Sequence, residues 1–149
     1  MEILRQFTYG FFSTLGFAIL FQAPKKSLIT NGIIGGIGWI VYKYLMLNGY
    51  SILFSAMVAS IIIGSISAIT SVFIKMPAIT FFAPSIIPLV PGGGMYYTMY
   101  YLIMQETDKF GAKALETTLT ALAIAMGIFL SVSTVNTIRS IYYSIKYKC

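Results

Sequence analysis

Long uncharged intervals dominate the chain, and the charged residues fall almost entirely between them. A helix of about 20 apolar residues crosses the hydrocarbon core of a bilayer. The pattern therefore predicts an all-α polytopic membrane protein with about five transmembrane segments, forming a single integral membrane domain over residues 1–149. The predicted segments are residues 6–23, 28–47, 50–74, 77–105 and 117–138.

The fourth segment differs from the others because prolines and glycines interrupt it. The interrupting residues are Pro77, Pro84, Pro88, Pro91, Gly92, Gly93 and Gly94. Proline lacks the N–H group that a helix needs and crowds the preceding turn, so Pro84 would free the carbonyl of Thr80. We predict a broken segment with helical halves near residues 78–90 and 94–105. Full crossing and folding back on the same side both remain open.

This break is the predicted functional site. Unwound backbone at membrane depth is tolerated only where it is buried in protein or lines a water-filled cavity. A half-helix that starts near Gly94 would point free N–H groups, at its positive end, toward a carboxylate. The predicted substrate-pathway residues are Pro84, Ser85, Pro88, Pro91, Gly92, Gly93, Gly94, Tyr97 and Thr98. The alternative is a proline-kinked helix that only shapes packing.

Small residues recur at helical spacing in the second, third and fifth segments. In lipid, helices associate through close backbone contact, which glycine and serine permit. The predicted helix-packing or partner-contacting residues are Gly32, Gly35, Gly36, Gly38, Ser60, Gly64 and Gly127. Packing within the chain and packing against a second polypeptide both fit this pattern.

Composition excludes several classes of protein. Hydrophobic residues make up 58% and charged residues 9%, whereas a soluble domain carries about 25% charged residues. The chain has no histidine, and its single cysteine is Cys149. We therefore predict no disulfide, no metal site, no cofactor and no catalytic residue, and hence no enzyme. The four acidic residues lie near the N-terminus or in a predicted loop from Glu106 to Glu116, so a buried carboxylate for proton coupling is also missing. The polar candidates inside the predicted segments are all neutral: Gln22, Asn31, Thr80, Thr98 and Asn136.

The net charge of +6 is scattered rather than gathered on one helix face. It indicates membrane topology and contact with lipid, not nucleic-acid binding. With five crossings the larger share of basic residues shares a face with the C-terminus, which we therefore place in the cytoplasm. That face carries Lys25, Lys26, Lys75, Arg139, Lys146 and Lys148, against Arg5, Lys43, Lys109 and Lys113 on the other.

One run of residues resembles a known family. Pro84-x-x-x-Pro88-x-x-Pro91-Gly92, followed by Met95-Tyr96-Tyr97-Thr98-Met99, resembles the signature of the threonine/serine exporter family. The likeness is to the small-subunit type, which corresponds to the C-terminal half of the fused exporters. Gly16-Phe17-Ala18-x-x-Phe21-x-x-Pro24 and Gly35-Gly36-Ile37-Gly38-Trp39 fit the same family in order and spacing. The similarity runs from about Gly10 to Tyr143.

The resemblance implies a multi-pass protein of the bacterial inner membrane that works beside a larger subunit of the same family. It implies proton-driven export of threonine and serine, or of a dicarboxylate such as succinate, with the coupling group on the partner. The competing hypothesis is a non-transporting accessory subunit that stabilises a partner through its glycine-rich faces. Homo- and hetero-oligomers both remain open.

Overall fold

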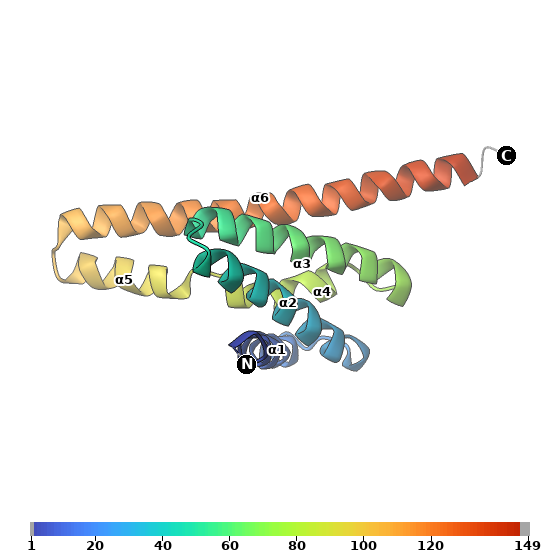
Figure 1. Ribbon diagram of the computed structural model, residues 1–149, viewed down its shortest axis with the longest axis horizontal. Helices are drawn as coiled ribbons and strands as arrows, with labels where there is room; N and C mark the ends of the chain where they lie inside the picture. The colour runs from blue at the N-terminus through green and yellow to red at the C-terminus, as the bar shows by residue number, and fades with distance from the viewer. Residues whose placement is uncertain (1, 147–149) are drawn as a thin grey trace.

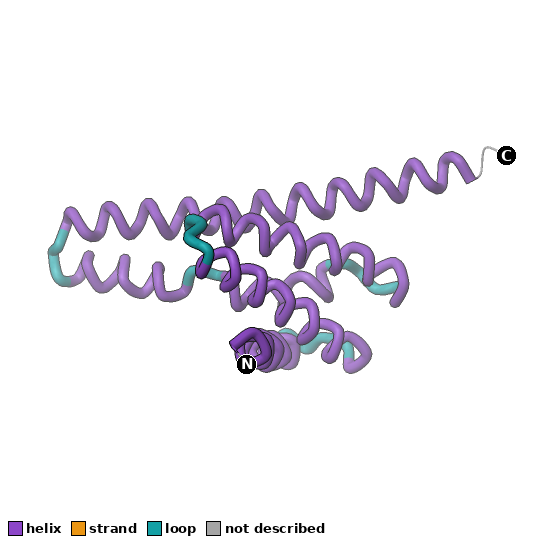
Figure 2. Tube along the Cα trace, viewed as in Figure 1, coloured by secondary structure: helices purple, strands orange, loops and turns teal. Residues whose placement is uncertain are grey.

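The structure is a computed structural model that describes the backbone of residues 2–146 and the side chains of residues 2–135 and 137. Within residues 2–146 all regular elements are helices and no strand is present, as the sequence predicts (Figure 2). The elements are α1 (Glu2–Leu20), η1 (Lys25–Ser27), α2 (Leu28–Leu47), α3 (Ile52–Ile74), α4 (Ile79–Ile86), η2 (Ile87–Leu89), α5 (Gly92–Ile103) and α6 (Thr107–Lys146).

Helices α1 to α4 gather into a bundle, α6 runs along α3, and α5 projects beyond the bundle with the first part of α6 (Figure 1). Helix α5 packs against α6 and buries none of its residues. Helix α6 has 40 residues, which at 1.5 Å per residue is about 60 Å and twice the thickness of a bilayer core. Part of α6 therefore extends past any membrane that the bundle crosses.

Two helices are long and apolar enough to cross a membrane: α3 and the part of α6 from Thr107 to Val135. A third span is present if α4–η2 and α5, which meet at an angle of 51°, are counted together. Helices α1 and α2 have 19 and 20 residues but are not among these candidates. The count of five spans and the crossing of the fourth segment stay predictions. The side chains of Arg139, Lys146 and Lys148, on which the predicted orientation partly rests, lie outside the described residues.

Local signals fix the ends of α3. The Ser51 hydroxyl accepts a hydrogen bond from the N–H of Phe54 at 3.3 Å, which caps the start of the helix. At the other end Lys75 adopts a left-handed conformation with φ 56°, and its N–H bonds the carbonyl of Ser71. In the turn between α2 and α3 the chain changes direction at Gly49, whose φ of 83° suits glycine.

The stretch from Glu106 to Glu116, expected to be a loop, is mostly helix. Helix α6 begins at Thr107, ten residues before the predicted span at 117. Lys113 pairs with Glu116 at 3.0 Å, three residues apart on the helix surface. Charge density was therefore a poor indicator of a loop, because paired charges at this spacing are compatible with a helix.

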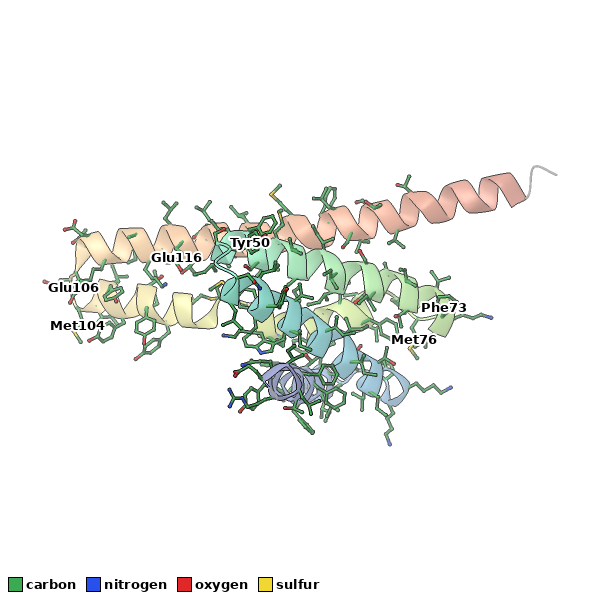
Figure 3. The ribbon with its side chains drawn as sticks, viewed as in Figure 1. Tyr50, Phe73, Met76, Met104, Glu106 and Glu116 are labelled. Atoms are coloured by element: carbon green, nitrogen blue, oxygen red, sulfur yellow. The ribbon has the colours of Figure 1, made fainter. Side chains whose placement is uncertain are left out.

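The core lies where α4 packs against α2 and α3, with α6 packed against the other side of α3. The buried cluster consists of Ile34, Ala56, Ala59, Ile63, Phe81, Leu89 and Ile124. Phe81 of α4 is fully buried at its centre. In Figure 3, Tyr50 and Glu116 lie at one end of α3, and Phe73 and Met76 lie at the other. Helix α4 is thus held inside the bundle, whereas α5 leaves it.

Candidate functional site

The break in the fourth segment has a defined backbone path. Helix α4 tightens into η2, and Val90 then adopts an extended conformation with φ −58° and ψ 131°. At Pro91, with φ −76° and ψ 59°, the chain makes a tight turn in which the N–H of Gly92 donates to the carbonyl of Val90 at 2.7 Å. Helix α5 begins at once on the far side of this turn.

Two of the carbonyls that the prolines free are bonded within the protein. The Nδ2 group of Asn31 donates to the Thr80 carbonyl at 3.1 Å, replacing the N–H that Pro84 lacks. The N–H of Val90 donates to the Ile87 carbonyl at 3.0 Å, where Pro91 cannot. These two carbonyls are therefore not left free for a solute.

The start of α5 is open. Pro91 supplies no side-chain cap to the first N–H groups of the helix. Gly92 and Gly93 are exposed, and a Cβ atom added to either would meet nothing within 4 Å. Gly94 is different, because a Cβ there would meet the Thr117 side chain of α6. The open end of α5 is therefore confined to its first two residues.

The remaining predicted site residues are dispersed. Pro84 and Ser85 are buried in the bundle, and Pro88 and Pro91 are partly buried. Thr98 turns back on its own helix, where its hydroxyl donates to the Gly94 carbonyl at 2.8 Å. Tyr97 is half exposed and its ring lies 6.3 Å from that of Tyr101. The structure thus places Pro84 and Ser85 together in the bundle, apart from Gly92 and Gly93 in the hairpin.

A buried polar cluster joins α1, α2 and α4. We call Thr14, Asn31, Thr80 and Ser85 the Asn31 cluster. Besides the Asn31–Thr80 bond, the Ser85 hydroxyl donates to the backbone carbonyl of Asn31 at 3.1 Å. Thr14, Asn31 and Ser85 are all 0% exposed. Two buried atoms, Oγ1 of Thr14 and Oδ1 of Asn31, have no hydrogen-bond partner among the described residues.

Two open hollows lie along the contact between α1 and α4–η2, which we call the α1–α4 seam. The first has a volume of about 260 Å³, and the described residues that line it are Phe21, Gln22, Ala23, Pro24, Ile79, Thr80, Ala83 and Pro84. The second has a volume of about 220 Å³ and is lined by Tyr9, Gly10, Ser13, Trp39 and Pro88. Each hollow touches a proline of the predicted pathway.

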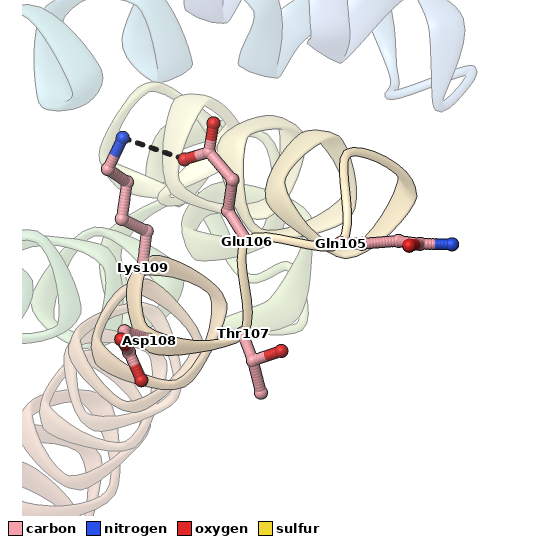
Figure 4. Close-up of a pocket in the computed structure, with 5 residues that line it drawn as sticks. All are labelled: Gln105, Glu106, Thr107, Asp108 and Lys109. Atoms are coloured by element: carbon pink, nitrogen blue, oxygen red, sulfur yellow. Dashed lines mark ion pairs between the residues drawn. The ribbon is translucent and has the colours of Figure 1, made fainter.

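A third and larger hollow, of about 480 Å³, lies at the tip of the hairpin (Figure 4). It is formed by the turn from Gln105 to Lys109, far along the hairpin from the break. Lys109 pairs with Glu106 at 2.7 Å, and this carboxylate raises the pKa of Lys109. This exposed ion pair closes one side of the turn and needs no bound solute.

The small residues predicted for packing lie at three helix contacts. A Cβ added to Gly32, Gly35 or Gly36 of α2 would strike Phe11, Thr14 or Phe7 of α1. One added to Gly38 would strike Ile63 of α3. Between α3 and α6 the contacts alternate: Gly127 faces Ser60, and Gly64 faces Ser131. These positions allow backbones to approach within the chain.

Thr14 was not among the predicted site residues, and Asn31 was noted only as a neutral polar residue inside a segment. The available signal was weak: an amide in the second segment and a carbonyl freed by Pro84 in the fourth. Nothing in the sequence indicated that Asn31 and Thr80, which are 49 residues apart, would form a hydrogen bond. Asn136, noted in the same way, lies outside the described side chains.

The sequence matches a known family over most of its length. The family described as "Threonine/Serine exporter, ThrE" matches residues 6–134. The chain belongs to the threonine/serine exporter family. The resemblance seen in the proline–glycine run is therefore confirmed at the level of the family. The small-subunit type remains a prediction.

A curated relative from Mycobacterium tuberculosis (strain ATCC 25618 / H37Rv), described as a probable threonine/serine exporter, is 27% identical over 109 residues. The alignment covers 72% of this chain and 21% of the relative. The chain thus spans about a fifth of the length of the curated relative it matches. No solved structure matches the chain.

Proposed function

We propose that this chain is one subunit of a secondary transporter that exports a small carboxylate-bearing solute. Threonine and serine, or a dicarboxylate such as succinate, are the solutes that the family resemblance implies. The observation that carries this proposal is the 51° break between α4–η2 and α5, in a chain from an exporter family. Broken helices form substrate sites in many secondary transporters.

The exposed start of α5 supplies the chemistry for a carboxylate. The first N–H groups of a helix lack intrahelical partners and lie at its positive end. The N–H of Gly92 already bonds the Val90 carbonyl, so the groups left for a solute are those of Gly93 and Gly94. No side chain covers the backbone at Gly92 and Gly93, and Pro91 offers no cap. A solute carboxylate would contact the backbone there, with Pro88 and Pro91 fixing the direction of the helix.

A larger partner subunit completes the proposal. The curated relative is about five times longer than the stretch that aligns with this chain, and the resemblance to the small-subunit type implies a separate larger subunit. Helix α5 buries none of its residues, which leaves its tyrosine-rich surface available to such a partner. The four acidic residues lie at Glu2 or between Glu106 and Glu116, so we place the proton-coupling group on the partner. The assembly would lie in the bacterial inner membrane, with the C-terminus of this chain in the cytoplasm.

The test is a bulky substitution at the open end of α5, in cells that express this chain with the larger subunit. Gly93→Leu has room for its side chain, so the protein should reach the membrane normally while export falls at least tenfold. Gly111→Leu is the matched control, because Gly111 is also an exposed helical glycine with nothing within 4 Å of an added Cβ. Export would be followed as efflux of labelled threonine, serine and succinate.

Normal export by Gly93→Leu at normal protein levels would remove the start of α5 from the pathway. Absence of efflux of all three solutes from cells with the unaltered pair would reject the transporter proposal itself. In that case, loss of the larger subunit from the membrane when this chain is deleted would support the accessory role instead.

A further inference from the structure

The orientation of the Asn31 side chain is fixed by its neighbours. Its Nδ2 group donates to the Thr80 carbonyl at 3.1 Å. A flipped amide would set Oδ1 against that carbonyl, and two acceptors do not bond. Oδ1 is therefore the atom left without a partner, although the side chain is 0% exposed. A buried acceptor of this kind is unfavourable by about 1–3 kcal/mol.

Thr14 presents a second unpartnered group one helical turn away. Its side chain packs against Gly35, which lies four residues after Asn31 and so on the same face of α2, about 6 Å along the helix. Its Oγ1 has no partner among the described residues, whereas the other described threonine hydroxyls in the helices mostly bond a carbonyl of their own helix. The two orphaned atoms thus lie about one helical turn apart along one face of α2, which meets α1 at Gly35 and α4 at Asn31.

Two donors of this cluster are already in use. Nδ2 of Asn31 serves Thr80, and the hydroxyl of Ser85 serves the Asn31 carbonyl. What remains is one amide oxygen that accepts hydrogen bonds and one threonine hydroxyl that can accept or donate. The complementary ligand therefore carries hydrogen-bond donors, such as an ammonium or a hydroxyl group.

The Asn31 cluster lies between the two hollows of the α1–α4 seam. Thr80 and Pro84 line the first hollow, and Pro88 lines the second. Four residues of helix separate Pro84 from Pro88, about 6 Å. On α1, Ser13 lines the second hollow next to Thr14. The Asn31 cluster therefore separates the two hollows in this structure.

We propose that the α1–α4 seam is a solute passage and that Asn31 Oδ1 and the Thr14 hydroxyl bind the solute where the passage narrows. No acidic or basic residue is among the described residues that line the two hollows. A dianion would lose its hydration there without a counter-charge, which is costly. The seam therefore takes a small zwitterion or neutral polar solute, with its donor groups on Asn31 and Thr14. This inference rests on the proposed transport function.

Thr14→Val separates a solute contact from a structural role. Valine has nearly the shape of threonine and removes a hydroxyl that bonds nothing, so the variant should be as stable as the parent or more so. Transport of labelled L-threonine or L-serine by membrane vesicles containing the full assembly should require about five to ten times more solute for half-maximal rate. Ser67→Ala is the control, because Ser67 is also 0% exposed with an unpartnered hydroxyl but lies on α3.

Trp39 gives a second measurement. It is the only tryptophan of the chain and lines the second hollow. In the assembly, adding L-threonine should change the emission of Trp39, and subtracting the signal of a Trp39→Phe assembly removes the fluorescence of the partner. The L-threonine concentration that gives half of this change should rise about five- to tenfold in Thr14→Val and stay unchanged in Ser67→Ala.

Each outcome has one meaning. Thr14→Val equal to the parent in transport, or Thr14→Val and Ser67→Ala equally impaired, would overturn the passage and leave the exporter proposal standing. Succinate transport as efficient as L-threonine transport would overturn the solute class. Vesicles of the unaltered assembly that transport no solute would reject the proposed function instead.

Discussion

The side-chain amide of Asn31 donates a hydrogen bond to the backbone carbonyl of Thr80, from α2 to α4, at 3.1 Å. Pro84 stands four residues after Thr80 and has no N–H to offer that carbonyl. The proline that weakens α4 from within therefore creates the acceptor that ties α4 to α2. The Ser85 hydroxyl donates to the backbone carbonyl of Asn31, so two hydrogen bonds connect α2 and α4 at this point.

The first prediction concerns this tie. Asn31→Leu keeps the number and branching of the side-chain heavy atoms and removes the donor, which leaves the partly buried Thr80 carbonyl unpaired. Loss of this bond should lower the free energy of unfolding by about 1–3 kcal/mol, whereas loss of the unpartnered Oδ1 should raise it by a similar amount, so the single variant should change little. Titration with a denaturing detergent, followed by circular dichroism, would measure the change.

Pro84→Ala is the partner in this experiment because alanine restores the N–H that Thr80 needs. Pro84→Ala should therefore stabilise the protein by about 1 kcal/mol more in the Asn31→Leu background than in the parent, which gives a coupling energy in a double-mutant cycle. Additive effects of the two substitutions would mean that the bond contributes nothing to the fold.

The second prediction concerns the contact of α1 with α2. A Cβ atom on Gly35 would overlap the side-chain atoms of Thr14, including its Cβ at 2.7 Å. Because Cβ cannot rotate away, Gly35→Ala must push the helices apart, at a cost of about 1–3 kcal/mol. The melting temperature of the purified protein in detergent would report this loss.

Gly16→Ala is the control for that substitution. Gly16 lies in α1 with nothing within 4 Å of an added Cβ, and alanine favours a helix over glycine by about 1 kcal/mol. The two glycine substitutions should therefore act in opposite directions. A stabilised Gly35→Ala would show that α1 does not lie against α2 at this point.

The bounds of the second helix and the break in the fourth segment follow from short-range signals. Leu28–Leu47 was predicted as a segment and is the helix α2. Prolines and glycines act on their own turn of backbone, so the sequence located the end of α4–η2 and the start of α5 within two residues.

Long-range pairing and the role of charge were not readable in the same way. The Glu106–Glu116 stretch looked like a loop because charge usually marks the edge of a membrane span, but paired charges also fit an extended helix. The Asn31 cluster depends on which helix faces lie together. That arrangement comes from the packing of Gly32, Gly35 and Gly36 on α1, which periodicity alone cannot assign to a partner.

The third prediction compares two contacts between α3 and α6. A Cβ on Gly127 would meet both the Ser60 hydroxyl and the Met57 backbone carbonyl at 2.8 Å, whereas a Cβ on Gly64 would meet mainly the Ser131 side chain. A backbone carbonyl cannot move aside as a hydroxyl can. Gly127→Ala should therefore destabilise the protein by about 1 kcal/mol more than Gly64→Ala.

Rescue identifies the cause in each case. Ser131→Gly should restore the stability of Gly64→Ala, because it removes the whole obstructing side chain. Ser60→Gly should restore Gly127→Ala only in part, since the Met57 carbonyl stays. Both series would be measured by detergent titration. Equal and complete rescue in the two series would show that the carbonyl does not limit the contact.

The last prediction concerns the origin of the bend. Spin labels at Ile79 and Ile103, which are 61% and 73% exposed, mark the ends of the two arms. Straightening two arms of about 17 Å each through 51° would lengthen the separation of their ends by about 3 Å. Pro91→Ala allows residue 91 to donate to the Ile87 carbonyl and should increase the distance between the two labels, with export falling in parallel.

Labels at Leu115 and Phe129 of α6 are the control and should keep their separation. An unchanged Ile79–Ile103 distance in Pro91→Ala would mean that packing of Gly94 on Thr117, rather than the missing N–H, holds α5 at its angle.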